Sequence, residues 1–333
     1  MKILFSSYHN KYFITITEYI EDAIEGTGHE LIKFDDRQHI LPGRVRSRID
    51  RLNRLDLNNI NKKLLTLARE TKPDIALIAG GHRISKETVK ALRARGILTV
   101  LWTIDAPIHF EPILEAASSY DHIFCQGTEA VEILQRAGIK NVNWLPMACS
   151  PRYHRPISIT SEEKKLFEND IVFIGSYYPN RWETLRRLSG HNMAVWGPGW
   201  SKVSKNGVPN RVIHDEKLNY NRWVKIYSAA KIVLIIHFQD RKVPCFQASP
   251  KVFETLACGC FALVDCQKDV FSIFKNEVHL VGYSDFRELR EKIRYYLDHP
   301  DERRRIAAQG RKEVLNLHTF EHRVKELLSV CIV

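Results

Sequence analysis

The feature that most constrains the fold is an alternation of short apolar runs and amphipathic runs that begins at the N-terminus, breaks, and begins again. In the first half, strand-like runs lie at residues 2–6, 29–34, 74–79, 98–103 and 122–125, and helix-like runs lie at 12–26, 85–95 and 129–137. Alternation of this kind is typical of a parallel sheet covered by helices.

The pattern breaks between residues 146 and 169, where Pro146, Pro151 and Pro156 precede a charged stretch. It resumes with strand-like runs at 170–175, 193–196, 231–236 and 261–265, and with helix-like runs at 182–188, 220–228, 251–257, 286–298, 301–315 and 321–328. A chain of 333 residues also exceeds the usual single domain of about 150–250 residues.

We therefore predict an α/β fold with two Rossmann-like domains facing a cleft. The predicted boundaries are 1–148 for the first domain, 149–169 for a linker, 170–318 for the second domain, and 319–333 for a C-terminal helix that could cross back to the first domain. Ligands of such domains bind at the carboxyl ends of the strands.

The cysteines and the N-terminus indicate a cytoplasmic protein. The chain has no apolar stretch of the roughly 18 residues that a membrane span needs, and the first residues lack the apolar core and cleavage site of a signal peptide. Seven scattered cysteines do not suggest a disulfide framework. Cys258, Cys260 and Cys266 lack the spacing of a metal clasp, so buried packing is the simpler interpretation and no metal is predicted.

The net charge of +11 suits a polyanionic ligand, because such a ligand is attracted to an excess of cations. Residues 1–150 contain 20 Lys and Arg against 18 Asp and Glu, whereas residues 151–333 contain 30 against 21. A nucleic acid, an acidic membrane and a nucleotide diphosphate would all fit this excess. No helix-turn-helix, zinc-finger or RNA-binding motif accompanies the charge, so we do not expect a nucleic-acid partner.

The most informative segment is SPKVFETLACG, at residues 249–259. Ser249 and Pro250 begin a short helix, and a helix N-terminus binds anions through its free N–H groups. Lys251 lies in the first turn, and Glu254 shares its face three residues later. The lysine could hold a diphosphate while the carboxylate accepts hydrogen bonds from ribose hydroxyls, although an ordinary surface ion pair would have the same spacing.

This segment resembles the donor-binding helix of GT-B glycosyltransferases. The stretch from 286 to 328, which contains ELREKIRYYLDHPDERRRIAAQGRKEVLNLHTFEHRVKELL, resembles the C-terminal, group 1-type glycosyltransferase domain of the CgeB-like (spore maturation protein-like) family. The resemblance extends over roughly residues 171–328 and is much weaker in the first half. Many retaining members have a second glutamate eight positions before the one that matches Glu254, and here that position is Phe246.

The resemblance implies further donor-binding residues in the second half. Gly175 and Ser176 match a donor-phosphate loop, and Arg181 could neutralise the leaving group or be a solvated residue at a helix start. The turn Trp196-Gly197-Pro198 would form a wall of the base pocket, or simply a packed turn, with His214 adjacent. Arg241 follows a buried strand and could contact phosphate.

In the first half, Asp105 follows the strand-like run 98–103, at the end where active sites form. It could deprotonate the acceptor hydroxyl of an inverting enzyme, or orient the sugar in a retaining one, or only cap the next helix. His9 and Asn10 follow the first strand and could line the acceptor side, although a lone loop histidine is more often structural.

Residues 37–63 contain eight Lys and Arg against two acids, with apolar residues at helical spacing. A basic amphipathic helix can lie on an anionic membrane. The face has no Trp or Phe, so a helix packed on the sheet is the simpler interpretation, and a peripheral contact with the inner membrane face stays open.

We therefore predict a glycosyltransferase that takes a sugar from a nucleotide-diphosphate sugar. The sequence contains no DxD motif, so metal-independent stabilisation of the leaving group by Lys251, the helix N-terminus and an arginine is expected, with no cofactor. The acceptor could be a glycan, a lipid or a protein, as in the biosynthesis of cell-surface polysaccharides or glycoconjugates. The alternatives are a nucleotide-sugar epimerase of the same fold and a catalytically degenerate protein that binds a nucleotide or a surface.

Overall fold

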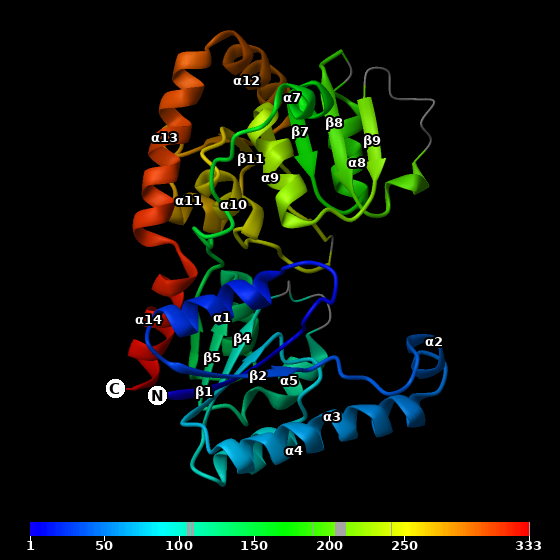
Figure 1. Ribbon diagram of the computed structural model, residues 1–333, viewed down its shortest axis with the longest axis vertical. Coiled ribbons are helices and arrows are strands. Elements are labelled where there is room, and N and C mark those ends of the chain that lie inside the picture. The colour runs from blue at the N-terminus through cyan, green and yellow to red at the C-terminus, as the bar shows by residue number, and fades with distance from the viewer. Residues whose placement is uncertain (105–106, 108–109, 189, 204–210, 241, 333) are drawn as a thin grey trace. The chain divides into compact units, whose positions relative to one another are not determined.

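The chain folds into two α/β units, each built on one six-stranded sheet (Figure 1). The computed structural model describes residues 1–104, 107, 110–188, 190–203, 211–240 and 242–332. Unit 1 comprises Met1–Pro146 and Phe320–Val333, and unit 2 comprises Met147–Thr319. The fold class predicted from the alternation, two Rossmann-like α/β domains, is confirmed.

The sheet of unit 1 has the strand order β2-β1-β3-β4-β5-β6, and all its paired strands are parallel. The strands are β1 (Lys2–Ser7), β2 (Glu30–Asp35), β3 (Ile75–Ala79), β4 (Leu98–Thr103), β5 (His122–Cys125) and β6 (Val142–Trp144). The central strands read as apolar runs because helices cover both faces of a parallel sheet.

The helices of unit 1 are α1 (Ile16–Gly26), α2 (Gly43–Arg46), α3 (Asp50–Thr71), α4 (Lys86–Arg93), α5 (Glu111–Ala117), α6 (Thr128–Arg136) and, from the far end of the chain, α14 (Phe320–Cys331). Helix α1 starts later than predicted because Thr15 and Glu18 form a capping box. Helix α14 packs in this unit, where the ring of Phe320 lies 6.0 Å from that of Tyr19 and 6.3 Å from that of Trp102.

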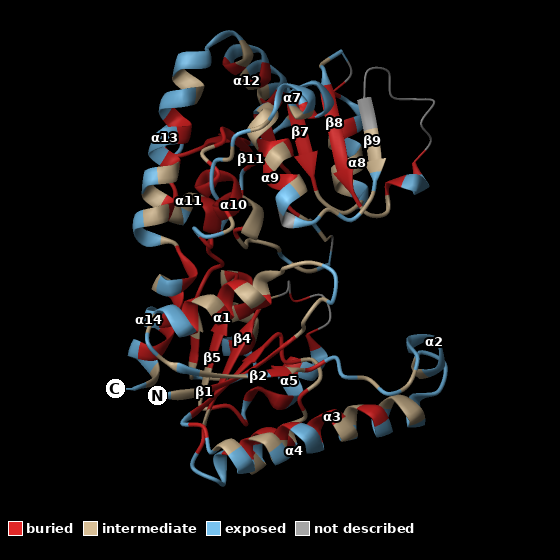
Figure 2. Cartoon of the chain, viewed as in Figure 1, coloured by how far each residue is buried: buried red, intermediate tan, exposed pale blue. Residues whose placement is uncertain are grey.

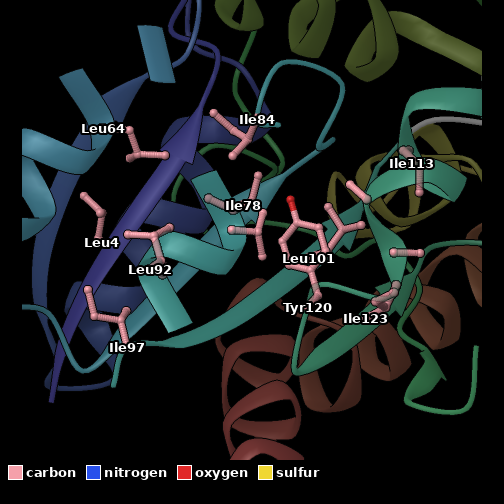
Figure 3. Close-up of a cluster of buried hydrophobic side chains, with 14 of the residues drawn as sticks. Leu4, Leu64, Ile78, Ile84, Leu92, Ile97, Leu101, Ile113, Tyr120 and Ile123 are labelled. Atoms are coloured by element: carbon pink, nitrogen blue, oxygen red, sulfur yellow. The ribbon is translucent and has the colours of Figure 1, made fainter. Parts of the chain in front are cut away.

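One hydrophobic core of unit 1 joins the sheet to α3, α4 and α5. Figure 3 shows Ile78, Leu101 and Ile123, which come from three neighbouring strands, among side chains of these helices. Helix α3 contributes only its later turns to this core, through Ile60, Leu64 and Ala68. Its first turns and α2 lie beyond the edge of the sheet, and α2 is exposed (Figure 2).

The sheet of unit 2 has the order β12-β11-β10-β7-β8-β9 and is also parallel. The strands are β7 (Asn169–Ile174), β8 (Met193–Gly197), β9 (Arg211–Asp215), β10 (Ala230–Ile235), β11 (Ala262–Asp265) and β12 (Val281–Tyr283). The helices are α7 (Ser161–Phe167), α8 (Pro179–Arg186), α9 (Tyr220–Ala229), α10 (Pro250–Ala257), α11 (Lys268–Ile273), α12 (Phe286–Asp298) and α13 (Pro300–Leu317).

The segment 149–169, which we expected as a linker, contains a helix. Thr160 and Glu163 form a reciprocal capping box that starts α7, and the segment lies within unit 2. No helix in the described ranges combines the length and the apolarity that crossing a membrane requires.

Candidate active site

The candidate site lies at the carboxyl edge of the unit 2 sheet, where the strand order reverses between β7 and β10. Ligands of doubly wound sheets bind at such switch points, because the helices that follow the two strands leave on opposite faces. Arg181, in α8, spans the two strand ends: its Nε donates to the carbonyl of Ile236 at 2.9 Å, and its Nη1 donates to the carbonyl of Ser176 at 2.9 Å. The guanidinium is therefore held at the switch point.

The charge of Arg181 has no paired carboxylate. Among the described residues, no Asp or Glu lies within ion-pair distance of its guanidinium. The charge of Asp265 affects the pKa of Arg181 from beyond that distance. Burial lowers the pKa of Arg181, while Tyr178 and Asp265 raise it. The group also lies over the rings of Phe173 and Tyr178, at 5.5 and 4.9 Å. A partly desolvated cation with only carbonyl partners is suited to an anionic ligand.

Two glycines let the ends of β7 and β8 approach closely. Gly197 has φ of +139°, and a Cβ placed on it would lie 2.2 Å from the carbonyl oxygen of Gly175. That carbonyl accepts from the indole Nε1 of Trp200 at 2.8 Å. A Cβ on Gly175 would lie 3.3 Å from Nη1 of Arg181, so glycine there also makes room for the guanidinium.

Trp196 does not present an open stacking face. Its side chain is 1% exposed, and its ring is stacked on His214, with centroids 3.4 Å apart and an interplanar angle of 5°. The two residues are register partners on β8 and β9. The ring of Phe167 contacts Trp196 edge-on at 6.0 Å. The predicted base-pocket wall is therefore filled by protein at Trp196, and what remains of it is the backbone turn at Gly197-Pro198.

The N-terminus of α10 is fastened to the end of β10. Ser249 is the N-cap, and its Oγ accepts from the backbone N–H of Lys251 at 3.3 Å, with Pro250 as the first helical residue. The N–H of Ser249 in turn donates to Nε2 of His237 at 3.0 Å. His237 follows Ile236, whose carbonyl binds Arg181, so Arg181 and the start of α10 are held by consecutive residues.

His237 is itself positioned by Asp265, at the end of β11. Its Nδ1 lies 2.6 Å from Oδ1 of Asp265, and its backbone N–H donates to the same carboxylate at 3.0 Å. Because Nε2 accepts an N–H, the neutral ring carries its proton on Nδ1 and donates it to Asp265. Burial raises the pKa of the Asp265 carboxyl, but His237 and the hydrogen bonds from it and Gln267 outweigh this effect and leave the pKa lowered.

Glu254 is buried between Lys251 and His154. Its Oε2 lies 2.8 Å from Nζ of Lys251, and its Oε1 lies 4.0 Å from Nε2 of His154. Burial raises the pKa of Glu254, but Lys251 and the neighbouring His154 lower it by more than burial raises it. The net pKa is therefore below its ordinary value, and the carboxylate is ionised. The ion pair is thus not the ordinary surface pair that its spacing alone allowed, since Glu254 is only 8% exposed.

His154 is a buried partner that the sequence patterns did not indicate. Its Nδ1 accepts from the backbone N–H of Ser150 at 3.0 Å, so the neutral ring carries its proton on Nε2, toward Glu254. Burial lowers the pKa of His154 to about 4. Its signal in the sequence was weak, because it lies in the proline-containing segment 146–156 that reads as a linker.

The remaining predicted residues have varied placements. Asp105 and Arg241 lie outside the described residues. In unit 1, His9 follows β1, but its Nε2 lies 2.6 Å from the buried Glu21. Oδ1 of Asn10 accepts from the backbone N–H of Tyr12 at 2.9 Å, which forms a local turn. The ring of Phe246, at the position of the missing glutamate, lies under Nζ of Lys268 at 5.0 Å.

In the part of the chain that the structure describes, no three His, Cys, Asp or Glu side chains are grouped as ligands.

The fold and this site define a class of protein. Residues 181–329 match the sequence model of the family described as "Glycosyl transferase-like". The two parallel six-stranded sheets and the solved structures of the same fold show that the chain has the GT-B fold, and the family match shows a glycosyl transferase-like domain in its second half. The chain is similar to spore protein CgeB of Bacillus subtilis (strain 168), with 25% identity over 276 residues, which are 78% of this chain and 83% of that protein.

Solved structures share the fold at low identity. Sucrose-phosphate synthase from Thermosynechococcus elongatus superposes with a TM-score of 0.71 at 11% identity, covering 99% of this chain and 98% of the other. Anabaena HepE, crystallised in complex with UDP-glucose, superposes with a TM-score of 0.69 at 14% identity, covering 99% of both chains. A glycosyltransferase from Rickettsia africae has a TM-score of 0.67 at 11% identity, covering 99% of this chain and 97% of the other.

Proposed function

We propose that this glycosyltransferase takes its sugar from a nucleotide-diphosphate sugar bound by unit 2. The observation that carries the proposal is the link between Arg181 and α10. The guanidinium of Arg181, which no described carboxylate pairs with, and the N-terminus of α10 are held by the consecutive residues Ile236 and His237. A diphosphate needs two such groups close together. HepE, which has the same fold, was crystallised with UDP-glucose.

The chain's own groups supply the charge stabilisation that this reaction needs. When the glycosidic bond to the nucleotide breaks, negative charge develops on the leaving diphosphate. Arg181, Lys251 and the positive end of the α10 helix dipole would stabilise that charge. We infer that no metal is required. Glu254 would accept hydrogen bonds from the ribose hydroxyls with the lone pairs that Lys251 leaves free. Asp105 stays our prediction for the base or the sugar-orienting residue in unit 1.

A thermal-shift panel of nucleoside diphosphates and their sugars tests the donor site. Only a ligand that binds the folded state raises the melting temperature. We expect one base to raise it, equally with and without EDTA, and the shift to be lost in Glu254→Gln. Glu183→Gln is the matched control, because Glu183 is an exposed glutamate of unit 2 paired with Arg186. If no nucleotide stabilises the wild-type protein, the proposed donor site is wrong.

Product analysis separates transfer from the competing activity. With the stabilising nucleotide sugar alone, a transferase leaves the sugar configuration unchanged or releases the sugar slowly to water. Conversion of the donor to its epimer would replace our proposal by a nucleotide-sugar epimerase. Binding without any turnover in the presence of a broad acceptor panel would favour the degenerate protein.

We also infer a peripheral membrane contact for the start of segment 37–63. Four large apolar side chains within residues 40–55 are exposed, namely Ile40, Val45, Ile49 and Leu55. Exposed arginines are interspersed among them, at positions 44, 48, 51 and 54. Apolar side chains ringed by cations are typical of a surface that binds an anionic bilayer. The later turns of α3 pack on the sheet. The packed-helix interpretation therefore applies to the end of segment 37–63, and the membrane interpretation applies to its start.

Sedimentation with vesicles tests this contact. We expect the protein to pellet with vesicles of equal parts phosphatidylglycerol and phosphatidylcholine, and to remain in the supernatant with phosphatidylcholine alone. Ile49→Asp should abolish pelleting, whereas Leu317→Asp, at an equally exposed leucine of unit 2, should not. Equal pelleting of both variants would contradict the contact.

A further inference from the structure

Unit 1 contains a cationic cavity that none of the roles above uses. It has a volume of about 380 Å³, which is at the lower end of the roughly 300–1,000 Å³ typical of small-molecule sites. Its described lining residues are Arg37, His39, Arg46, Asn53, Leu57, His82 and Arg83. Five of these seven are Arg or His, and none of the described ones is acidic.

The cavity lies at the carboxyl edge of the unit 1 sheet. Arg37 and His39 follow β2, and His82 and Arg83 follow β3, while the other lining residues belong to α2 and α3. β1 lies between β2 and β3, and the strand order reverses between β1 and β3. This is the position at which a doubly wound sheet binds its ligand. In a GT-B enzyme whose unit 2 holds the donor, it is available to the acceptor.

Two buried carboxylates hold the cations in place from behind. Asp36 is 3.2 Å from Nη1 of Arg83, and Asp56 is 3.3 Å from Nε of Arg46. Asp56 also lies 2.8 Å from Nδ1 of His39 and accepts the N–H of Ile40 at 2.9 Å. Because each carboxylate is buried and already bonded, the side chains they hold are ordered before any ligand binds, which lowers the entropy cost of binding.

Arg37 adds a third guanidinium to the cavity. Burial raises the pKa of the Asp36 carboxyl, and the charge of Arg37 partly offsets that rise. Its guanidinium lies over the ring of Tyr8 at 3.7 Å, and within the described ranges it makes no ion pair at contact distance. Three guanidinium groups, those of Arg37, Arg46 and Arg83, therefore line the cavity, whereas the neighbouring acids Asp35, Asp36 and Asp56 are not among its described lining residues.

We propose that this cavity binds a phosphate group carried by the acceptor. The inference rests on the proposed transferase function, because only a transferase has an acceptor. A carboxylate has two oxygens, which one arginine fork satisfies. A terminal phosphate has three, and arginines from three separate segments can address them. The cavity thus selects a phosphorylated acceptor over a neutral sugar. The phosphate could belong to a soluble sugar phosphate or to a lipid phosphate, because the recognised chemistry is the same.

Binding of two defined probes tests the cavity. We would titrate glucose 6-phosphate and dihexanoylphosphatidic acid, which is a water-soluble lipid phosphate, into the protein by calorimetry, with glucose as the uncharged control. We expect one or both phosphates to bind and glucose not to bind. Glucose 6-phosphate alone would identify a soluble acceptor class, and dihexanoylphosphatidic acid alone a lipid-linked one.

Asn53→Asp is the decisive variant, since it places a negative charge in the cavity with almost no change of shape. We expect it to weaken phosphate binding by about tenfold or more, because like charges repel at close range. Asn58→Asp is the matched control, because Asn58 is an exposed residue of the same helix that does not line the cavity. Arg37→Gln should weaken binding as well, and it leaves no buried carboxylate without its partner.

The outcomes separate this inference from the donor site. The proposed phosphate site is wrong if neither phosphate binds the wild-type protein, or if Asn53→Asp and Asn58→Asp bind phosphate equally. This holds even if a nucleotide still binds unit 2. Phosphate binding that is lost in Asn53→Asp but kept in Glu254→Gln supports the cavity. If that result occurs while no nucleotide binds, the anion site stands and the transferase proposal falls.

Discussion

Nε2 of His237 lies 3.0 Å from the backbone nitrogen of Ser249 and accepts its N–H. The bond joins the end of β10 to the N-cap of α10, and it requires an unprotonated Nε2. Asp265 secures that state by accepting the proton on Nδ1. The position of α10 therefore depends on contacts among His237, Ser249 and Asp265, which come from three separate segments of the chain.

Removing the imidazole should loosen the start of α10 and destabilise unit 2. In His237→Ala, the Ser249 N–H loses its acceptor and the buried Asp265 loses its main partner. We expect the free energy of unfolding to fall by about 2–4 kcal/mol, which is typical when hydrogen bonds to a buried charge are lost, and nucleotide binding to weaken with it. Urea unfolding and the thermal-shift panel measure the two effects. His299→Ala, at an exposed histidine, should change neither, and an unaltered His237→Ala protein would refute the positioning role.

The burial of His154 predicts a pH dependence of stability. Its pKa is about 4 in the folded protein, against an ordinary value of 6.5, so the unfolded chain binds more protons between these values. Stability is therefore fully present above about pH 6.5 and falls as the pH decreases toward 4, by roughly 3 kcal/mol in total. His154→Gln should flatten this part of the curve, as measured by urea unfolding at several pH values. A slope that persists in His154→Gln would exclude His154 as its source.

The close approach of β7 and β8 predicts an unequal response to two glycine substitutions. In Gly197→Ala the new Cβ would lie 2.2 Å from the backbone oxygen of Gly175, which cannot rotate away. Gly190 also has a positive φ, of +96°, but a Cβ there would meet nothing within 4 Å. We expect Gly190→Ala to cost about 1 kcal/mol from backbone strain alone, and Gly197→Ala on the order of 3 kcal/mol or more. Thermal unfolding would show the difference, and equal losses would mean that the clash is relieved.

The fork of Arg181 predicts that lysine cannot replace it. A lysine keeps the charge but cannot donate to the carbonyls of Ser176 and Ile236 while also facing a phosphate. We expect Arg181→Lys to weaken nucleotide diphosphate binding roughly 10- to 100-fold, from about 1.5–3 kcal/mol per charged hydrogen bond, and to lower the melting temperature because a carbonyl loses its donor. Arg186→Lys, on the same helix but paired with the exposed Glu183, should bind normally. Calorimetric titration of the nucleotide compares them.

The positions of the strand ends could be predicted from the sequence, and with them part of the site. Gly175 and Arg181 were indicated by the family resemblance, whereas the segment from Ser249 to Glu254 was indicated because a helix start with a lysine and a glutamate at helical spacing is a local feature. The helices α12 and α13 were indicated for the same reason, since their amphipathic period is local.

The partners within the site could not be predicted. Glu254 is paired with Lys251 three residues away, but its other neighbour, His154, is 100 residues away in a segment that reads as a linker. Trp196 was expected to lie either in a wall of the base pocket or in a packed turn, and the register of β8 and β9 sets His214 against its ring. No local pattern specifies which side chain faces another across a sheet.

The sequence by itself determined the fold class and the positions of most elements, because periodicity, glycines and capping residues act over a few neighbouring positions. The class of reaction was predicted from the resemblance of the segments 249–259 and 286–328 to a known family. The tertiary structure alone decided which groups are charged, buried and bonded to one another. Desolvation and hydrogen bonding depend on atoms brought together from distant segments, so the neutral His154, the His237–Asp265 pair and the cationic cavity beside Arg37 exist only after the chain has folded.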